Sequence, residues 1–359
     1  MSTQMFPRRV PKSLCSLSKP EKRCYLLLFI VLLNIAGLSL LSHGAKGGTR
    51  GRQARADDAS RAVVFPKKAV VLFTRWRSGS TFMGELMKMA DRGIFYSYEP
   101  LSEYGPHVLY ENIEETHMAV EELKNVLRCQ FDSSEVDEIL ETNPLLREAC
   151  ETSGLCKNAN KTGELCKKAS LHVAKVLRLG LRWARPLLEW EDVDVKVIYM
   201  VRDPRAVFSS RARVPWCSTP TCNDLQTVCS MLTDDLEEAS FLQRYYPNRF
   251  HFILYDQFCQ TPFAGLRDLM TFLGLPVTRD QERILQTKLP STDPLSIYKN
   301  STAQAQLWRE KSSFPKIVVP VQRWCWDSLE TLGLRVFYSE KDLVDLSLPV
   351  VLRPVDLSG

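Results

Sequence analysis

The residues best suited to chemistry lie between Arg75 and Phe82, in the order R-W-R-S-G-S-T-F. A short apolar run precedes this segment and a helix-forming run follows it. That arrangement places backbone amides and the positive end of a helix around an anion. Gly79 lets the backbone approach a ligand closely, while Ser80 and Thr81 add hydroxyl groups. Arg77 adds a permanent, forked cation. The segment predicts a site for a compact phosphate-like group, although an ordinary strand–turn–helix with an N-cap serine has the same spacing.

The segment lacks the features of a metal-dependent nucleotide site. The motif G-x-x-x-x-G-K-[ST] is absent, and no clear magnesium-binding aspartate follows. No cluster of His, Cys and carboxylates has metal-ligand spacing. We therefore expect the site to work without a metal.

A second candidate segment covers residues 201–211 and reads V-R-D-P-R-A-V-F-S-S-R. Arg202 stands at the end of a strongly apolar run, and Ser210 lies two helical turns further on. Ligands of parallel sheets collect beyond the carboxyl ends of strands, so both side chains could reach a second phosphate. The alternative is a solvated helix start with proline in its first turn.

These segments need a sheet to position them. Apolar runs typical of buried strands alternate with helix-forming stretches, which predicts an α/β fold with a central parallel sheet covered by helices on both faces. The expected strands are residues 70–73, 94–98, 173–177, 195–201 and 250–255. The expected helices are residues 81–90 and 224–246, one that reaches residue 273, and several within 278–340. Because no second linker appears, residues 67–345 are expected to form one domain, followed by a C-terminal tail at 346–359.

The N-terminus predicts a membrane anchor. Residues 25–41 are apolar and uncharged, just long enough to cross a bilayer, and basic residues precede them. We expect a cytosolic tail at 1–24, a transmembrane signal anchor at 25–42 and a stem at 43–66. A cleaved signal peptide is the alternative. The net charge of +5 is concentrated in this region, so the remainder gives no reason to expect a nucleic-acid partner.

Cysteine usage favours an oxidising compartment for the part after the anchor. The chain has 11 cysteines, and two of them, Cys15 and Cys24, precede the apolar run. The remaining number is odd, so at least one thiol is free or pairs between chains. Asn160 and Asn300 begin glycosylation sequons, which matter only if this part faces a lumen.

Several segments resemble one family. R-S-G-S-T-F-M-G-E-L (77–86) resembles the 5′-phosphosulfate loop of the Golgi carbohydrate sulfotransferases, and residues 201–211 resemble their 3′-phosphate segment. The best match is the galactose/N-acetylglucosamine/N-acetylgalactosamine 6-O-sulfotransferase group. Residues 98–101 and 298–309 look like two further motifs of that group. Cys217 and Cys222 look like an additional pair, and Lys299 stands where arginine is usual.

The resemblance implies a single P-loop-like sulfotransferase domain behind an anchor in the Golgi membrane, with the catalytic part lumenal. It implies transfer of a sulfuryl group from 3′-phosphoadenosine 5′-phosphosulfate to a sugar 6-hydroxyl of a glycan acceptor. Arg77 would stabilise charge on the bridging oxygen, and Arg202 and Ser210 would bind the 3′-phosphate. The donor site as a whole is assigned to Arg75, Trp76, Arg77, Ser78, Gly79, Ser80, Thr81, Phe82, Arg202 and Ser210.

Glu99 is the candidate general base, because it ends the second expected strand and a carboxylate there can face the bound sulfate. The alternative is a structural ion pair with Arg77 or another arginine. His107 and His172 are weaker candidates. The residues after Pro100, at 101–104, depart from the family pattern, which puts the acceptor in doubt.

Three other functions fit the sequence less well. One is a sulfotransferase acting on heparan-type chains, another sugar position or protein tyrosine. Another is a donor- or glycan-binding protein without catalysis, and a nucleotide kinase is more remote. A homodimer is compatible with the sequence.

Overall fold

The computed structural model describes residues 67–110, 113–132, 158–286, 300–355 and 357. The expected tail, anchor and stem lie outside these residues, as do Cys150, Cys156 and Lys299. Within the described ranges, no helix has both the length and the apolar character needed to span a membrane.

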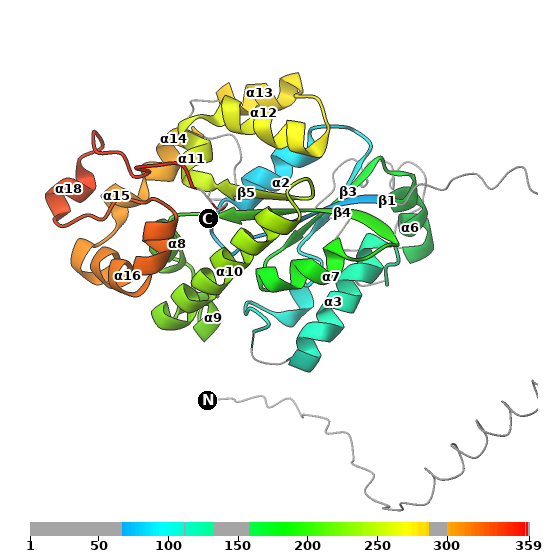
Figure 1. Ribbon diagram of the computed structural model, residues 1–359, viewed down its shortest axis with the longest axis horizontal. Coiled ribbons are helices and arrows are strands. Elements are labelled where there is room, and N and C mark those ends of the chain that lie inside the picture. The colour runs from blue at the N-terminus through cyan, green and yellow to red at the C-terminus, as the bar shows by residue number, and fades with distance from the viewer. Residues whose placement is uncertain (1–66, 111–112, 133–157, 287–299, 356, 358–359) are drawn as a thin grey trace, which may run out of the picture. The chain divides into compact units, whose positions relative to one another are not determined.

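Five parallel strands form one sheet in the order β2-β3-β1-β4-β5 (Figure 1). The strands are β1 (Lys67–Phe73), β2 (Ile94–Tyr98), β3 (Leu171–Val176), β4 (Val193–Val201) and β5 (Phe250–Leu254). The central strand β1 pairs with β3 on one side and β4 on the other, with Phe73 opposite both Val176 and Tyr199. All five expected strands are therefore confirmed. Their bounds shift by a few residues, and Tyr255 begins a helix.

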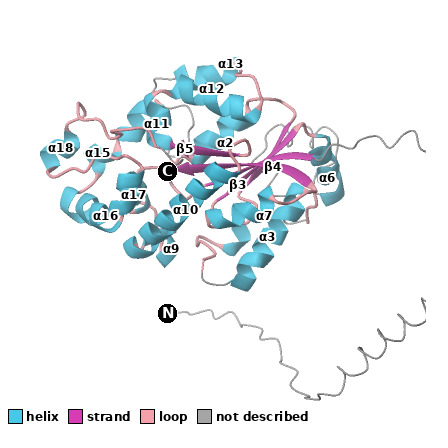
Figure 2. Ribbon diagram, in the orientation of Figure 1, coloured by secondary structure: helices cyan, strands magenta, loops and turns pink. Residues whose placement is uncertain are grey.

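Helices cover both faces of the sheet, as predicted (Figure 2). Neighbouring residues of a strand point to opposite faces, so the apolar run of β1 serves two cores. Val71 and Phe73 pack in the core formed with α3, α7 and α10. Val70 and Leu72 pack in the core formed with α2, α12 and α13. A strand buried on both faces explains why β1 shows no polar alternation.

The helices have the following bounds. Before β5 lie α2 (Ser80–Lys88), α3 (Ile113–Leu127), α6 (Ala159–Lys168), α7 (Arg185–Leu188), α8 (Pro204–Arg211), α9 (Pro220–Asn223) and α10 (Leu225–Tyr245). After β5 lie α11 (Tyr255–Gln260), α12 (Pro262–Leu273), α13 (Arg279–Gln286), α14 (Ser301–Gln306), α15 (Trp308–Lys311), α16 (Val319–Trp324), α17 (Trp326–Thr331) and α18 (Glu340–Val344). Short turns of 3₁₀ or π type are η1 (Ser102–Tyr104), η2 (Leu181–Ala184) and η3 (Phe314–Val318).

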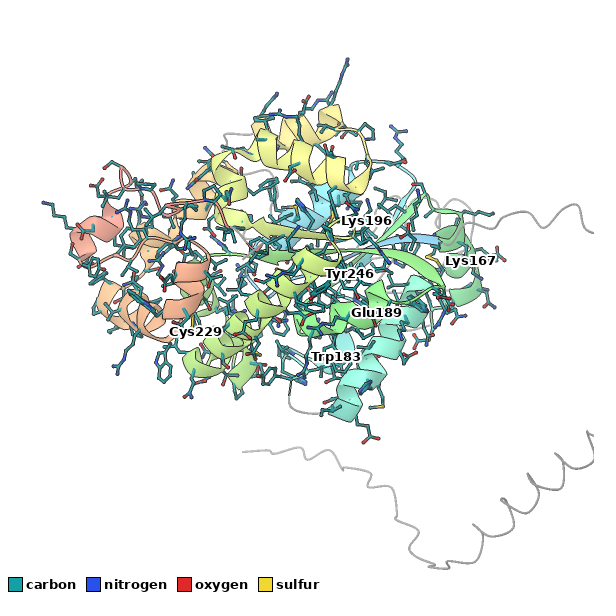
Figure 3. The ribbon with its side chains drawn as sticks, in the orientation of Figure 1. Lys167, Trp183, Glu189, Lys196, Cys229 and Tyr246 are labelled. Atoms are coloured by element: carbon teal, nitrogen blue, oxygen red, sulfur yellow. A yellow bond between two sulfur atoms is a disulfide. The ribbon has the colours of Figure 1, made fainter. Side chains whose placement is uncertain are left out.

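The long helix α10 is fastened near both ends. A disulfide joins Cys229 in its first turns to Cys325. Beyond its last turn, the Tyr246 hydroxyl donates to Glu189, 2.9 Å away (Figure 3). Between these points Asp235 reaches from the helix toward the end of β1. Helix α10 is therefore a fixed support beneath the strand ends.

The described residues contain two more disulfides, Cys129–Cys166 and Cys217–Cys222, while Cys259 is a buried free thiol. This arrangement agrees with the odd cysteine count. Residues beyond 345 also pack on the domain, because the Arg309 guanidinium donates to the carbonyls of Asp345 and Leu348.

Candidate active site

The loop between β1 and α2 is shaped to surround an anion. Gly79 has a φ of 94°, and a Cβ atom built on it would lie 2.5 Å from a ring carbon of Tyr255. The Ser78 hydroxyl closes the turn by donating to the Arg75 carbonyl at 2.7 Å. The first turn of α2 contains no acidic side chain, so its amide groups and positive dipole stay uncompensated.

Cationic side chains gather at this loop from the ends of β1 and β4. Arg77 Nε donates to Ser210 Oγ at 2.9 Å, and an Arg202 amino group donates to the Arg77 carbonyl at 3.1 Å. Burial, and then the guanidinium groups of Arg202 and Arg213, lower the pKa of Arg77. Arg77 thus meets Arg202 and Ser210, which follow it by more than 120 residues, and the two arginines concentrate positive charge.

Arg202 itself carries an unused donor. Its Nε is buried and has no hydrogen-bond partner among the described residues. Its guanidinium carbon lies 5.1 Å from the centre of the Tyr255 ring, which holds the side chain in place. A buried N–H without a partner is costly, and an anionic ligand would satisfy it. The residues present therefore fit a phosphate group.

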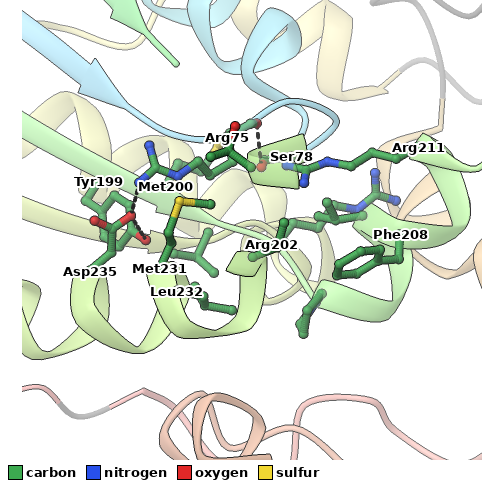
Figure 4. A pocket seen from close by; sticks show the side chains of 15 residues that line it. Arg75, Ser78, Tyr199, Met200, Arg202, Phe208, Arg211, Met231, Leu232 and Asp235 are labelled. Carbon is green, nitrogen blue, oxygen red and sulfur yellow. Dashed lines mark hydrogen bonds and ion pairs between the residues drawn. The ribbon is translucent and has the colours of Figure 1, made fainter. Parts of the chain in front are cut away.

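The remaining loop residues have different surroundings. Arg75 turns beneath the loop, where its guanidinium lies 2.5 Å from the Asp235 carboxylate (Figure 4). The same guanidinium lies 2.7 Å from the Leu179 carbonyl. It is therefore not brought to Arg77 and Arg202, and it supports the loop from below. Trp76 is buried, and the Arg211 guanidinium donates to its carbonyl.

At the start of α2, Ser80 is buried and Thr81 and Phe82 are half-buried. The Phe82 ring makes edge contacts with Tyr255 and Phe258. The Phe82 side chain therefore packs against α11.

Glu99 follows β2 and sits between two cations. Its Oε1 lies 3.0 Å from Lys175 Nζ, and its Oε2 lies 3.0 Å from an Arg178 amino nitrogen. The ion-pair alternative named Arg77 or another arginine as the partner of Glu99, and the structure shows the pair with another arginine, Arg178. Glu99 has a φ of 51° and Arg77 a φ of 71°, and among the described non-glycine residues only Cys129 shares this left-handed conformation. Such backbone costs free energy and concentrates at functional sites.

The family model of the sulfotransferase domain matches residues 67–316 of the chain. The chain belongs to the sulfotransferase family. It is 25% identical to carbohydrate sulfotransferase 5 of Mus musculus over 340 residues, which cover 79% of this chain and 85% of the relative. It is 26% identical to carbohydrate sulfotransferase 6 of Homo sapiens, with 81% and 86% covered. The predicted resemblance to carbohydrate sulfotransferases is confirmed, and so is the prediction of a sulfotransferase enzyme.

Among solved structures, the sulfotransferase domain from the curacin biosynthetic pathway aligns with a TM-score of 0.43 at 18% identity. The alignment covers 74% of this chain and 98% of that one.

The two histidines considered as bases lie in different places in this sulfotransferase. His172 is fully buried at the amino end of β3, and its Nε2 lies 2.8 Å from Ser97 Oγ. Burial lowers the pKa of His172 to about 3. The opposite end of the strand carries the site, so His172 is not brought there. His107 lies in the loop after β2, half-exposed.

Sequence reasoning missed the partners of the predicted residues. Lys175 is a buried lysine in a mostly apolar strand, a pattern that could have marked it. Arg178 follows the carboxyl end of β3, the position that drew attention to Arg202 after β4. Tyr255 carried no such signal, because only the fold shows that its ring fills the space beside Gly79.

A buried acidic pair supports Arg202 from behind. The Asp203 amide donates to Asp256 Oδ2 at 2.7 Å, and Asp203 in turn lies 2.7 Å from the Arg205 guanidinium. Burial, and then the nearby Asp203 carboxylate, raise the pKa of Asp256 to about 7. The turn that presents Arg202 is therefore held by α11, which follows β5, as well as by β4.

One group of metal-ligating residue types occurs among the described residues: Cys129, Cys166 and His172. The two sulfurs are joined in a disulfide, so they are not available as thiolate ligands. The expectation of metal-free chemistry stays a prediction.

Proposed function

We propose that this sulfotransferase transfers the sulfuryl group of 3′-phosphoadenosine 5′-phosphosulfate to a glycan. The observation that carries the proposal is the meeting of Arg77, Arg202 and Ser210 beside a preformed anion loop. The loop amides and Arg77 would hold the 5′-phosphosulfate. Arg202 and Ser210 would hold the 3′-phosphate.

Different residues of the site would have different roles in the reaction. As the acceptor oxygen bonds to sulfur, the bond from sulfur to the bridging phosphate oxygen breaks. Arg77 stabilises the negative charge that develops on that oxygen, and the fixed loop amides require no reorganisation. Glu99 accepts the proton of the acceptor hydroxyl. Lys175 and Arg178 fix the position of the Glu99 carboxylate, and the 3′,5′-bisphosphate leaves.

We further propose that the acceptor is the 6-hydroxyl of galactose, N-acetylglucosamine or N-acetylgalactosamine. The resemblance of the loop motifs supports this assignment, and the names of the relatives support a carbohydrate acceptor. The proposed location is the Golgi membrane, with residues 25–42 as anchor and residues 67–345 in the lumen. Three disulfides among the described residues support an oxidising compartment.

The test is transfer of labelled sulfate by the full-length chain to a panel of defined glycans with terminal or internal galactose, N-acetylglucosamine and N-acetylgalactosamine. Heparan-type chains and a tyrosine peptide complete the panel. NMR of the product locates the sulfate. We expect label at carbon 6 of one of these three sugars. Label only on heparan or tyrosine would overturn the acceptor assignment, and donor binding without transfer to any acceptor would overturn the enzymatic one.

A further inference from the structure

An exposed tryptophan lies next to the candidate active site and has no role in the chemistry described so far. Trp216 is 40% exposed and lies in the connection between α8 and α9. Its ring centre is 6.3 Å from that of Trp76, at an interplanar angle of 65°. Trp76 belongs to the anion loop itself. Large aromatic side chains are usually buried, so a tryptophan left open beside a reactive centre suggests a ligand.

Trp216 is linked through the Trp76 ring to the part of the site that contains the candidate base Glu99. The Arg178 guanidinium lies 5.5 Å from the centre of the Trp76 ring, and Arg178 also pairs with Glu99. Trp76 packs with Leu177, which follows β3, and with Val108 from the loop after β2. These contacts join Trp76, the ring neighbour of Trp216, to residues that follow β2 and β3. The proposed 3′-phosphate residue Arg202 instead follows β4.

The connection that carries Trp216 is held rigidly. The Cys217–Cys222 disulfide closes the segment that follows Trp216 directly, residues 217–222. Thr219 Oγ1 donates to the Pro106 carbonyl at 2.8 Å, and Thr221 Oγ1 accepts from the Val108 amide at 2.9 Å. The connection is thereby bonded to the loop after β2, which leads away from Glu99.

A further bond links this connection to the anion loop. The buried Arg211 guanidinium donates to the carbonyls of Cys222 and Trp76. Trp216 is therefore a preorganised surface, and a ligand that contacts it loses little affinity to ordering of the protein.

We infer that Trp216 forms the acceptor-sugar subsite, with its exposed indole stacking on the apolar C–H face of a pyranose ring. The inference rests on the proposed function and names the residue that recognises its acceptor. An indole offers a flat apolar surface with a single N–H, which suits a ring that is apolar on one face and hydroxylated at its edge. Trp76 and Arg178 link this surface to Glu99, so a sugar stacked on Trp216 would extend toward the base.

The experiment compares four full-length proteins: wild type, Trp216→Ala, Trp216→Tyr and Trp326→Ala. Trp326 is a matched control, 48% exposed on α17, which packs against α10 and α16. For each protein we measure the acceptor KM, kcat, the dissociation constant of the 3′,5′-bisphosphate and the melting temperature. Saturation-transfer NMR of the unsulfated glycan measures binding independently of turnover.

We expect Trp216→Ala to raise the acceptor KM on the order of tenfold and to remove the saturation transfer to the sugar C–H protons. Trp216→Tyr keeps a stacking face and should recover most of the affinity. The bisphosphate dissociation constant and the melting temperature should stay near wild type, and Trp326→Ala should change none of these quantities.

The outcomes separate this inference from the proposed function. An active wild type with an unchanged KM in Trp216→Ala overturns the inference alone. A raised bisphosphate dissociation constant with an unchanged acceptor KM assigns Trp216 to the donor adenine and also overturns it. If the wild type neither sulfates nor binds any glycan, the proposed function and the inference both fall.

Discussion

The site has one half at the ends of β1 and β4 and another at the ends of β2 and β3. The two halves differ in whether their charged side chains form ion pairs. On the β1–β4 half, neither Arg77 nor Arg202 forms an ion pair with any described residue, and their contacts are a hydroxyl and backbone carbonyls. On the β2–β3 half, Glu99 is balanced by Lys175 and Arg178. The first half therefore has positive charge available for a polyanion. In the second half, two cations are paired with one carboxylate, which suits a carboxylate held in place next to an uncharged acceptor.

The largest effect is expected from a substitution in the half at the ends of β2 and β3. Glu99→Gln keeps the shape but cannot accept a proton, so kcat at saturating donor and acceptor should fall about 10²- to 10⁴-fold. The dissociation constant of the donor should change little. The control is Glu238→Gln, because Glu238 is also ion-paired, with Arg185, and neither residue is assigned to the chemistry. That variant should lose stability and keep its kcat. A near-normal kcat in Glu99→Gln would leave Glu99 as a structural partner and make His107 the next candidate.

Removal of Arg77 tests the first half at its reacting end. Arg77→Ala should lower kcat about 10²- to 10³-fold, because a single preorganised contact to developing charge is lost. Arg77→Lys keeps a charge but loses the Nε bond to Ser210, so its kcat should lie between those of the wild type and Arg77→Ala. The melting temperature should stay close to wild type, since Arg77 has no acidic partner in the described structure. Wild-type turnover in Arg77→Ala would remove this residue from the mechanism.

A smaller effect is expected where the first half would hold the second phosphate. Arg202→Ala should weaken binding of the donor and of the 3′,5′-bisphosphate product by a similar factor, about 10- to 100-fold, because charged hydrogen bonds are lost. Ser210→Ala should weaken both by less than tenfold. Calorimetry with an analogue lacking the 3′-phosphate provides the check. If that analogue loses as much affinity as the donor does, the contact lies elsewhere.

The smallest effect concerns stability and pH behind Arg202. The pKa of Asp256 is about 7 in the folded chain, against the ordinary 3.8. Between these values the folded state binds more protons than the unfolded state, so Asp256 makes the protein less stable as pH rises through this window. Asp256→Asn still accepts the Asp203 amide and should raise the melting temperature at pH 8 by about 2 to 4 °C, with little change near pH 4. Asp268→Asn, at a carboxylate that is 75% exposed, should show no such pH dependence.

The sequence was informative wherever one segment holds a whole function. The apolar run into Arg75–Phe82 predicted a strand, a turn and a helix, and the structure has all three. The segment at 201–211 predicted that Arg202 and Ser210 could reach a second phosphate, and both residues contact Arg77 in the structure. In both cases the strand ends and the chemistry are adjacent in the chain.

The rest depended on contacts between distant segments. The order of strands places Lys175 and Arg178 beside Glu99, and nothing in their local spacing encodes that order. The Cys217–Cys222 pair was readable because its members are close in sequence. Cys229–Cys325 was not, since connectivity does not follow from spacing. Arg75 was misleading for a related reason, because its partner Asp235 comes from a helix 160 residues away.

The position of the Cys229–Cys325 bond in the chain also determines when it can form during biosynthesis. Its two cysteines are 96 residues apart, and a cross-link closing so long a loop removes about 4 to 5 kcal/mol of chain entropy from the unfolded state. The bond joins the support helix α10 to the segment between α16 and α17, so it forms only after nearly the whole domain has been synthesised. Every strand and all of the residues assigned to catalysis precede Cys325 in the chain. The sheet can therefore assemble during synthesis, while its final stabilisation awaits an oxidant that acts once translation is almost complete.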